Sequence, residues 1–323
     1  MTRLTERVLV TGACGQIGSE LTPVLRERYG NGNVVATDIR PPENACLRDQ
    51  GPFEQLNVCD RAAMDDIIAR YEIDTVYHMA AILSATGEEK PSLAWDVNIH
   101  GLRNVLEIAR ARSLLRVFCP SSIAVFGPDT PHDCAPQATI LQPTTMYGVT
   151  KVAGELLGEY YVQRFGLDIR GVRYPGIISS QTPPGGGTTD YAVDIFYQAI
   201  QSQRYSCFVR ADTVLPMMYM PDCIKATLDL MDADFASLRS HCNFNLAGMS
   251  FSAQELASEI QKHIPGFVCA YNPDFRQAIA DSWPQMIDDA PAREEWNWRP
   301  QFDLSSMTED MIAKLTARLE GVA

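Results

Sequence analysis

The chain has 323 residues, enough for one large hydrophobic core or for two unequal lobes. Apolar residues make up 46% of it and charged residues 21%, the usual proportions of a soluble globular protein. The formal net charge of −13 argues against nucleic acid or an anionic membrane as a partner, because both carry negative charge themselves.

Cysteine and histidine usage predicts neither a disulfide framework nor a metal site. The nine cysteines are odd in number and form no C-x-x-C pair, so we expect reduced thiols in a cytoplasmic protein. The five histidines show no metal-ligand spacing. Residues 1–10 lead almost at once into an apolar run, and we expect no signal peptide and no membrane-spanning segment.

The first motif along the chain is the glycine-rich stretch TGACGQIG, residues 11–18. The apolar run 7–10 before it predicts a buried strand, and after it Ile17, Leu21 and Leu25 share one helix face. A strand, a glycine turn and a helix N-terminus together form a cradle for phosphate groups. Glycine turns also serve tight turning alone, so this motif by itself indicates a nucleotide only weakly.

The second motif is an acidic residue at the end of the next expected strand. Residues 33–37 read as that strand, and Asp38 follows them. A carboxylate at this place accepts hydrogen bonds from the ribose hydroxyls of an adenosine and repels a 2′-phosphate, which favours NAD over NADP. Arg40 keeps NADP open, because an arginine nearby could hold that phosphate.

Strands and helices alternate through the first half of the chain. Strands are expected at 74–81, 114–122 and 167–176, and helices at 93–111 and 146–166. This alternation predicts an α/β fold with a Rossmann-type, doubly wound parallel sheet. Ligands of such folds gather where strands end, which here is at Gly12–Gly18, Asp38, His78–Ala81, Ser121–Ser122 and Arg173–Ile177.

The second half is richer in Pro and Gly and predicts a smaller C-terminal substrate lobe. Residues 1–178 are expected to form the NAD-binding domain, with a return segment near 214–245, and residues 179–323 mainly the substrate lobe. Expected elements are a helix at 219–232 capped by Asp222, a strand at 242–248, and a helix at 252–264 with Ser252 and Glu255 as a capping box.

Three residues form a candidate catalytic group. Tyr147 and Lys151 are four apart on an expected helix, so their side chains share one face. A lysine ammonium beside a phenol favours the phenolate, which can take a proton from a substrate hydroxyl while the nicotinamide takes a hydride. Ser122 ends a strand and can hold the substrate oxygen. The Tyr-x-x-x-Lys spacing alone is common by chance, so the prediction depends on the glycine turn upstream.

Together these landmarks resemble the extended short-chain dehydrogenase/reductases, the NAD-dependent epimerase/dehydratase family, from Thr11 to about Ile178. The matching segments are TGACGQIG, Asp38, HMAA, Asn98 in DVNIHG, PSSIAVFG and YGVTK. Within that family the chain is most similar to the NAD-dependent L-threonine 3-dehydrogenases. That resemblance rests on TGACGQIGSEL, AAILSATGE, PSSIAVFGP, RYPGIIS, GGGTTDYAVDIFYQA and DSWPQMIDD, which span both lobes.

The resemblance implies a role for each matching residue. Tyr147 is the general base, Lys151 its electrostatic partner, and Ser122 the group that holds the hydroxyl. Asn98 keeps the active-site helix in place and completes a proton path. The amino acid is surrounded by Ser84, Ser122, Tyr147, Gly187, Thr188 and Trp283.

The resemblance also implies contacts to NAD. The family often has Asp where Asn57 stands, but an asparagine can still accept the adenine amino proton, and we expect binding to survive. The implied cofactor residues are Gly12, Cys14, Gly15, Gln16, Ile17, Gly18, Asp38, Ile39, Arg40, Asn57, Val58, His78, Ala80, Ala81, Tyr147, Lys151, Tyr174, Gly176 and Ile177.

The implied reaction oxidises the C3 hydroxyl of L-threonine to 2-amino-3-oxobutanoate and forms NADH. The stretch GGGTTD offers amides and hydroxyls to a zwitterionic substrate, and Trp283 could cover its methyl group. A flexible linker and plain core packing are the alternatives for that loop and for Trp283. A 2-amino-3-oxobutanoate CoA ligase is a possible functional partner; otherwise the product decarboxylates to aminoacetone.

Two other readings stay open. A nucleotide-sugar 4-epimerase or 4,6-dehydratase would share the cofactor half, but a dehydratase typically has Asp-Glu after the serine, where Ile123 and Ala124 stand here. Basic groups for a nucleotide diphosphate are few in the second lobe: Arg204, Arg210 and Lys225. The other reading is a regulator that only senses the cofactor, and such proteins usually lack the Tyr/Lys pair.

The resemblance further implies a homodimer. Apolar faces on the helices expected at 93–111 and 146–166 would suit the four-helix contact of the family.

Overall fold

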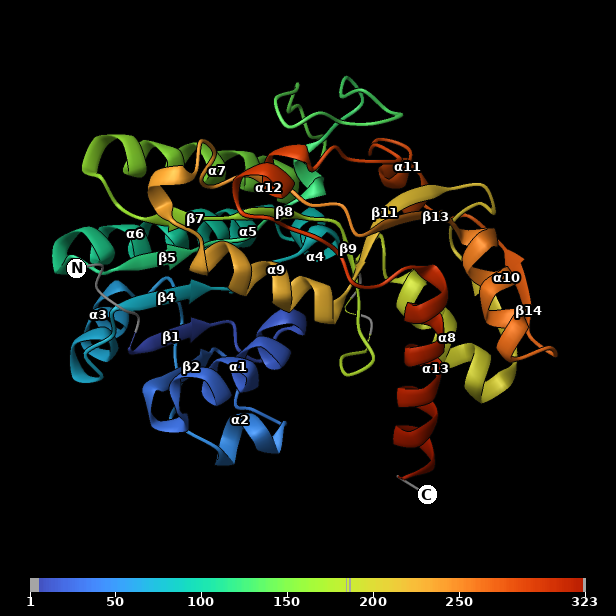
Figure 1. The fold of residues 1–323 in the computed structure, drawn as a ribbon, viewed down its shortest axis with the longest axis horizontal. Coiled ribbons are helices and arrows are strands. Elements are labelled where there is room, and N and C mark those ends of the chain that lie inside the picture. Colours follow the sequence, from blue (N-terminus) through green and yellow to red (C-terminus); the bar gives the residue numbers. More distant parts are fainter. Residues whose placement is uncertain (1–5, 184, 186, 322–323) are drawn as a thin grey trace. The chain divides into compact units, whose positions relative to one another are not determined.

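The computed structural model describes residues 6–183, 185 and 187–321 (Figure 1). Gly186, which belongs to the predicted substrate stretch GGGTTD, lies outside the described residues, as do Pro184, residues 1–5 and residues 322–323. The chain forms two compact units. The first contains residues 1–122, 145–173 and 227–244, and the second contains 123–144, 174–226 and 245–323.

The first unit is built on a six-stranded sheet in the order β3-β2-β1-β4-β5-β7. Each neighbouring pair is parallel; Val8 of β1, for example, lies between Val34 of β2 and Thr75 of β4. This confirms the predicted Rossmann-type sheet. The strands are β1 (Val8–Thr11), β2 (Val34–Asp38), β3 (Phe53–Gln55), β4 (Thr75–His78), β5 (Arg116–Phe118) and β7 (Ile169–Arg170).

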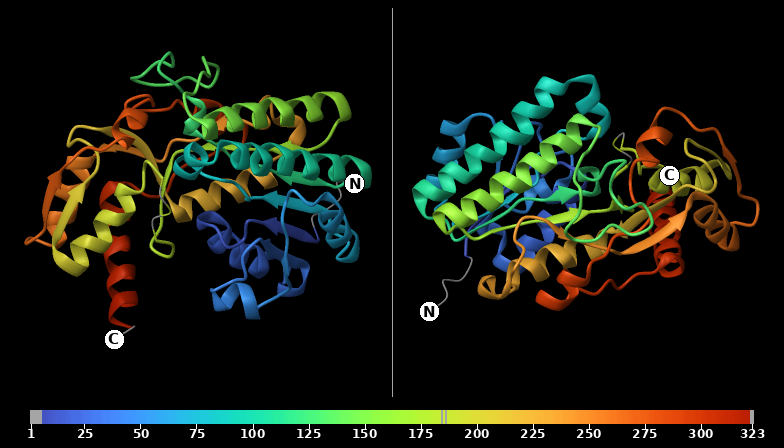
Figure 2. Two further views of the ribbon diagram at one scale, coloured as in Figure 1. Left: turned by 180° about the vertical axis from the view of Figure 1, so that it is seen from behind. Right: turned by 90° about the horizontal axis from the view of Figure 1, so that it is seen from above.

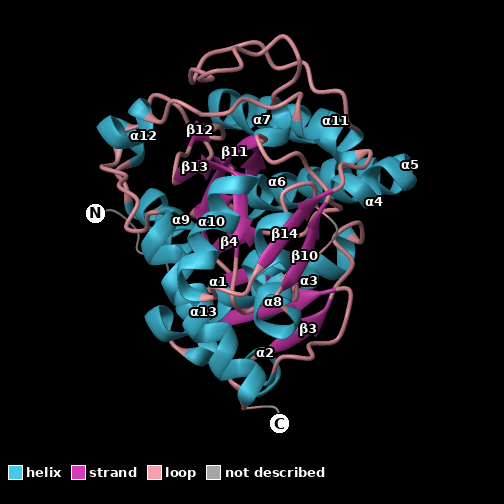
Figure 3. Ribbon diagram, turned by 90° about the vertical axis from the view of Figure 1, so that its right-hand side faces the viewer, coloured by secondary structure: helices cyan, strands magenta, loops and turns pink. Residues whose placement is uncertain are grey.

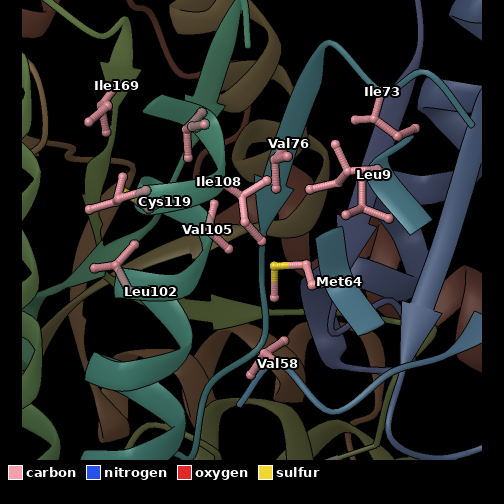
Figure 4. Close-up of a cluster of buried hydrophobic side chains, with 14 of the residues drawn as sticks. Leu9, Val58, Met64, Ile73, Val76, Leu102, Val105, Ile108, Cys119 and Ile169 are labelled. Atoms are coloured by element: carbon pink, nitrogen blue, oxygen red, sulfur yellow. The ribbon is translucent and has the colours of Figure 1, made fainter. Parts of the chain in front are cut away.

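Apolar side chains from both sheet and helices fill the core of this unit. Figure 4 shows Leu9 and Val76 of the central strands with Val105, Ile108 and other buried residues of the cluster. Two long helices, α6 and α7, lie side by side in both views of Figure 2. The helices are α1 (Gln16–Tyr29), α2 (Ala45–Asp49), α3 (Arg61–Arg70), α4 (Ser84–Glu89), α5 (Pro91–Trp95), α6 (Gly101–Arg112) and α7 (Met146–Phe165).

Two predicted elements are interrupted. The helix expected at 93–111 is α5 and α6 joined by a π-helical turn, Asp96–His100. The strand expected at 167–176 is instead three short strands, β7, β8 (Val172–Tyr174) and β9 (Gly176–Ile178). The chain changes its strand partners at Gly171 and at Pro175, where proline has no amide hydrogen to donate.

The other expected strands are shorter than predicted. The segment 114–122 contains β5 and then β6 (Ser121–Ser122), and 242–248 contains only β12 (Phe244–Asn245). The short strands β12, β8 and β6 form a three-stranded sheet of their own. The strand expected at 74–81 ends at His78, so His78 lies at the carboxyl edge of the sheet, and Ala80 and Ala81 follow in a loop.

The second unit has two small sheets. One pairs β10 (Arg204–Cys207) with β14 (Val268–Tyr271), which lie side by side in Figure 3. The other has the order β13-β11-β9, with β13 (Met249–Ser252) antiparallel and β9 parallel to β11 (Val214–Tyr219). Its helices are α8 (Tyr191–Ser202), α10 (Ala253–His263), α11 (Arg276–Ala280), α12 (Ala290–Glu295) and α13 (Leu304–Glu320), and α9 (Met220–Asp232) begins in this unit.

The two predicted helix caps have different outcomes. The capping box of α10 is confirmed, since Ser252 and Glu255 exchange both of its hydrogen bonds. The cap at Asp222 is wrong, because α9 already begins at Met220. The Asp222 carboxylate instead accepts hydrogen bonds from the amides of Gln301 (2.8 Å) and Phe302 (3.1 Å).

Over the described part of the chain, no helix is both long and apolar enough to cross a membrane.

Candidate active site

The glycine turn has the geometry of a phosphate cradle. Gly12 has a φ of +67°, and a Cβ there would lie 2.5 Å from the amide nitrogen of Ala80. A Cβ on Gly18 would lie 2.3 Å from the Gly12 carbonyl oxygen. Helix α1 begins directly after Gly15, which has no side chain, and its first turn has no acidic residue. The backbone can therefore approach an anion closely at the positive end of the helix.

Asp38 lies at the carboxyl end of β2, as the sequence predicts, and faces the same turn. Its carboxylate accepts hydrogen bonds from the amides of Cys14 (2.9 Å) and Arg40 (3.0 Å). The Arg40 guanidinium lies 3.8 Å from the carboxylate and is mostly exposed. Burial and the Asp38 charge raise the pKa of the Cys14 thiol to about 11, so Cys14 is a neutral thiol in this turn.

Ile39 and Asn57 lie at the surface of the first unit, and Val58 is buried beside helix α6. The side chain of Ile39 is 59% exposed, which leaves an apolar surface next to Asp38. The Oδ1 atom of Asn57 accepts a hydrogen bond from the Cys59 amide at 3.0 Å. A carbonyl oxygen has two lone pairs, so one remains for the adenine contact that the sequence implies.

His78 ends β4 and is buried. Its Nδ1 atom lies 2.8 Å from the Thr11 hydroxyl, and its Nε2 atom has no hydrogen-bond partner among the residues that the structure describes. Burial, and next the Lys151 charge, lower the pKa of His78 to about 3, so the ring is neutral. His78 and Lys151 line a cavity of about 30 Å³, large enough for a water molecule, with Asn98, Ser121, Thr150 and Glu155 among the other lining residues.

Asn98 connects three parts of the first unit. It lies in the π-helical turn, and its side chain both donates to the carbonyl of Ile82 (3.0 Å) and accepts from its amide (2.8 Å). The same amide group donates to the Thr150 hydroxyl at 3.0 Å, and that hydroxyl donates to the Tyr147 carbonyl at 2.8 Å. Asn98 therefore links the loop after β4 to the start of α7.

Tyr147 and Lys151 occupy the first two turns of α7. Thr145 caps this helix by accepting from the Gly148 amide at 3.1 Å, and this fixes where the helix begins. The Lys151 ammonium lies 5.4 Å from the centre of the Tyr147 ring and donates to the Pro120 carbonyl at 2.7 Å. Helix α7 packs against β6, which carries Ser122. The structure thus places the predicted pair on one helix face, next to the strand of the predicted serine.

Ser84 is the first residue of α4, which packs against the start of α7. A Cβ on Gly87 would lie 3.8 Å from the Cβ of Tyr147, and Glu88 accepts a hydrogen bond from the Met146 amide at 2.7 Å. Ser84 is buried. Helix α4 therefore belongs to the surroundings of Tyr147.

The remaining predicted cofactor residues lie in the second unit. Tyr174 and Ile177 are buried, and β9 pairs with β11. Gly176 must be glycine, because a Cβ there would lie 2.4 Å from the sulfur of Met217.

The predicted substrate residues of the second unit also have defined local surroundings. The Asp190 carboxylate accepts hydrogen bonds from the amides of Gly185 and Gly187, both at 2.7 Å. Two amides that the sequence analysis offered to a substrate carboxylate are therefore bonded within the loop itself. Thr188 is buried just before α8, and Trp283 is buried after α11.

Sequence reasoning missed Glu155 and named Ser121 and Arg173 only as strand ends, although all three lie next to the catalytic candidates. They form a buried hydrogen-bonded group beside Lys151. The available signal was spacing, since Glu155 follows Lys151 by four residues and shares its helix face.

Comparison with known proteins matches residues 8–247 to the NAD dependent epimerase/dehydratase family. An uncharacterized epimerase/dehydratase of Staphylococcus haemolyticus is 53% identical over 308 residues, 95% of this chain and 96% of that protein. The L-threonine dehydrogenase of Phytophthora infestans is 52% identical with a TM-score of 0.93, over 97% of this chain and 100% of that one.

Two further solved structures bear on the predictions. A monomeric L-threonine 3-dehydrogenase from a metagenome is 51% identical, with a TM-score of 0.93 over 96% of this chain and 99% of that one. The UDP-glucose 4-epimerase of Thermotoga maritima has a TM-score of 0.86 over 97% of this chain and 99% of that one, but it is 21% identical, so this likeness concerns the fold alone.

Proposed function

This chain belongs to the NAD-dependent epimerase/dehydratase family, and we propose that it oxidises the C3 hydroxyl of L-threonine with NAD to give 2-amino-3-oxobutanoate and NADH. The relatives named L-threonine dehydrogenase support this substrate, at about half identical residues over nearly the whole chain. The observation that carries the reaction type is the Tyr147–Lys151 pair on α7, beside the strand of Ser122.

The residues of the first unit fit a bound NAD. A Cβ at Gly12 or Gly18 would clash with backbone atoms, so glycine at both positions keeps the shape of the turn, and Asp38 follows β2 as expected for a group that binds ribose. We propose that residues 1–178 carry most of the cofactor contacts and that residues 179–323 carry most of the substrate contacts. Bound NAD supplies the acceptor for the hydride that leaves C3.

In the proposed mechanism Tyr147 accepts the proton of the substrate hydroxyl, assisted by Lys151 and Ser122. Tyr147 lies in the first turn of α7, and the Lys151 ammonium lies 5.4 Å from the centre of its ring. Tyr147 takes the proton of the substrate hydroxyl, and Ser122 holds that oxygen in place. Asn98 keeps the start of α7 attached to the loop after β4. The proposed contacts to the amino acid are Ser84, Gly187, Thr188 and Trp283.

The experiment that tests this function follows absorbance at 340 nm with purified protein. Wells contain L-threonine, L-serine, L-allo-threonine or UDP-galactose with NAD, and L-threonine with NADP. NADH formation with L-threonine and NAD is the expected result. An epimerase forms no net NADH, so UDP-galactose wells are also analysed by chromatography. Formation of UDP-glucose with no amino acid oxidised would contradict the proposal and favour the epimerase. The structure disfavours an epimerase, because Arg210, one of the basic groups that could bind a nucleotide diphosphate, is already paired with Asp281 at 2.8 Å.

Asp38 is expected to determine the preference for NAD. In Asp38→Asn the charge that repels a 2′-phosphate is lost, so kcat/KM for NAD should fall roughly tenfold while that for NADP rises. Steady-state kinetics with both cofactors measures this. Adding Arg40→Ala should remove the gain with NADP, because the Arg40 guanidinium lies 3.8 Å from the Asp38 carboxylate and could hold the 2′-phosphate. An unchanged cofactor preference in Asp38→Asn would mean that another residue sets it.

We also propose a homodimer formed through α5 and α7. Apolar side chains are exposed on these helices: Leu93 (42%) and Trp95 (39%), and Val149 (40%), Leu156 (67%) and Tyr160 (54%). Size-exclusion chromatography with light scattering should give a dimer for the wild type and a monomer for Leu156→Glu. Ile140→Glu, at a half-exposed residue on neither helix, should stay dimeric. A monomeric wild type at every concentration would refute the proposal, and one relative is itself monomeric.

A further inference from the structure

Glu155 is a buried carboxylate on the same face of α7 as Lys151 and Tyr147. It is 6% exposed. Burying a carboxylate costs several kcal/mol unless charged or hydrogen-bonding partners compensate it. Arg173 of β8 provides this compensation: its Nε atom donates to Oε1 at 2.9 Å and its Nη2 atom to Oε2 at 2.8 Å. Arg173 and Glu155 thus form a bidentate ion pair.

Ser121 adds a third hydrogen bond that the ion pair does not need. Its hydroxyl donates to Oε1 of Glu155 at 2.5 Å. Ser121 stands between Pro120, whose carbonyl accepts from the Lys151 ammonium at 2.7 Å, and Ser122, the predicted substrate-binding serine. The bond therefore fastens the strand segment that carries two of the groups on which the proposed chemistry depends.

These contacts close a ring. Lys151 reaches Pro120, the next residue Ser121 reaches Glu155, and Glu155 is one helical turn beyond Lys151 on α7. A ring of short bonds between one helix and one strand restricts the ammonium more than its single bond to a carbonyl would. We propose that Ser121 and Glu155 are positioning residues, which fix the Pro120–Ser122 segment and so hold Lys151 against Tyr147.

Other titratable groups near Tyr147 and Lys151 do not hold the Pro120–Ser122 segment to α7. His78 from β4 lines the same cavity, but burial keeps its pKa near 3 and the ring neutral. Cys242 also lines the cavity, and its hydrogen bond to Cys119 and its burial raise its pKa, so it carries no charge. Glu88 of α4 is occupied by the Met146 amide. Glu155, which lines the same cavity, bonds instead to Ser121 and Arg173.

Ser121→Ala tests the inference without breaking the ion pair. The inference rests on the proposed function for its kinetic part: kcat with L-threonine should fall about tenfold, and the pH at half-maximal kcat should move up. The melting temperature should stay near the wild-type value. Thr75→Ala is the matched control, because it also removes a buried hydroxyl that donates to a carboxylate, that of Asp74 at 2.6 Å. Thr75 begins β4, whereas His78, which lines the cavity beside Lys151, ends it. Thr75→Ala should change neither kcat nor the pH profile.

Chemical labelling of Lys151 decides the inference independently of turnover. Acetic anhydride is applied to the folded protein, and peptide mass spectrometry compares Lys151 with Lys90, which is exposed. Ser121→Ala should raise the labelling rate of Lys151 about fivefold relative to Lys90, since acetic anhydride reacts with the free amine, which is more accessible once the side chain is no longer held at the Pro120 carbonyl. Glu155→Gln keeps an acceptor for Ser121, so it should leave Lys151 labelling near wild type. It should lower the melting temperature, because the buried Arg173 guanidinium loses the negative charge of Glu155.

Unchanged labelling and an unchanged pH profile in Ser121→Ala would overturn the inference and leave Glu155 a purely structural ion pair. If labelling rises in Ser121→Ala but the wild type does not oxidise L-threonine, the positioning role stands and the proposed function alone has failed.

Discussion

Tyr147→Phe is expected to lower kcat for L-threonine oxidation about a thousandfold, because the variant loses the only group placed to take the hydroxyl proton in the proposed mechanism. The phenyl ring keeps the packing of the side chain against α4. Binding of NADH should therefore stay close to wild type. Initial rates at 340 nm measure the loss, and a fluorescence titration with NADH measures the binding.

The matched control is Tyr160→Phe on the same helix, where the side chain is 54% exposed. It removes the same hydroxyl far along α7 from the first turn, and its rate should equal that of the wild type. If Tyr147→Phe kept more than about a tenth of the wild-type kcat, another group would be the base, and the assignment of Tyr147 would be wrong.

Gly12→Ala is expected to abolish useful cofactor binding, with the Kd for NADH raised about a hundredfold or more. Two effects of the structure combine here. The φ of +67° is costly for any residue with a Cβ, by about 1–2 kcal/mol, and the new methyl would lie 2.5 Å from a backbone nitrogen that has little room to move. The turn must shift, and the shift moves the amides that we propose bind the cofactor phosphates.

The same substitution at Gly32 separates this effect from the general cost of replacing glycine. Gly32 has nothing within 4 Å of an added Cβ. Gly32→Ala should leave both the NADH affinity and the melting temperature unchanged. Tight NADH binding by a folded Gly12→Ala would show that the turn does not form the cradle.

The parts of the fold that the sequence predicted best are those with a local cause. Apolar runs gave the parallel strands, and the first helix and α7 begin close to where they were predicted. Asp38 could be placed because it directly ends an apolar run. Tyr147 and Lys151 could be placed because a four-residue spacing on a helix has one geometric meaning.

The mispredicted parts depend on distant residues. Asp222 looked like a helix cap, but its carboxylate serves the amides of Gln301 and Phe302, nearly 80 residues away. The strand expected at 167–176 breaks at Gly171, where a Cβ would lie 2.4 Å from the carbonyl oxygen of Cys119 and 2.8 Å from that of Cys242. No local pattern reports such close approaches.

The group around Glu155 shows the same limit within the candidate site. The spacing of Glu155 from Lys151 on α7 was visible in the sequence, but its partners Ser121 and Arg173 come from two strands, β6 and β8. Only the fold brings these three together. Whether the predicted contacts of Ser84, Gly187, Thr188 and Trp283 to the amino acid are correct stays a prediction that the kinetic experiments can test.

The most direct test of the proposed reaction uses deuterium to follow the bond that breaks. The purified protein is incubated with NAD and either L-[3-²H]threonine or L-[2-²H]threonine, and the NADH formed is examined by mass spectrometry. Oxidation at C3 predicts one deuterium in NADH from the first substrate and none from the second. Deuterium in NADH from the second substrate alone would place the oxidation at C2 and contradict the account, as would the absence of NADH from both.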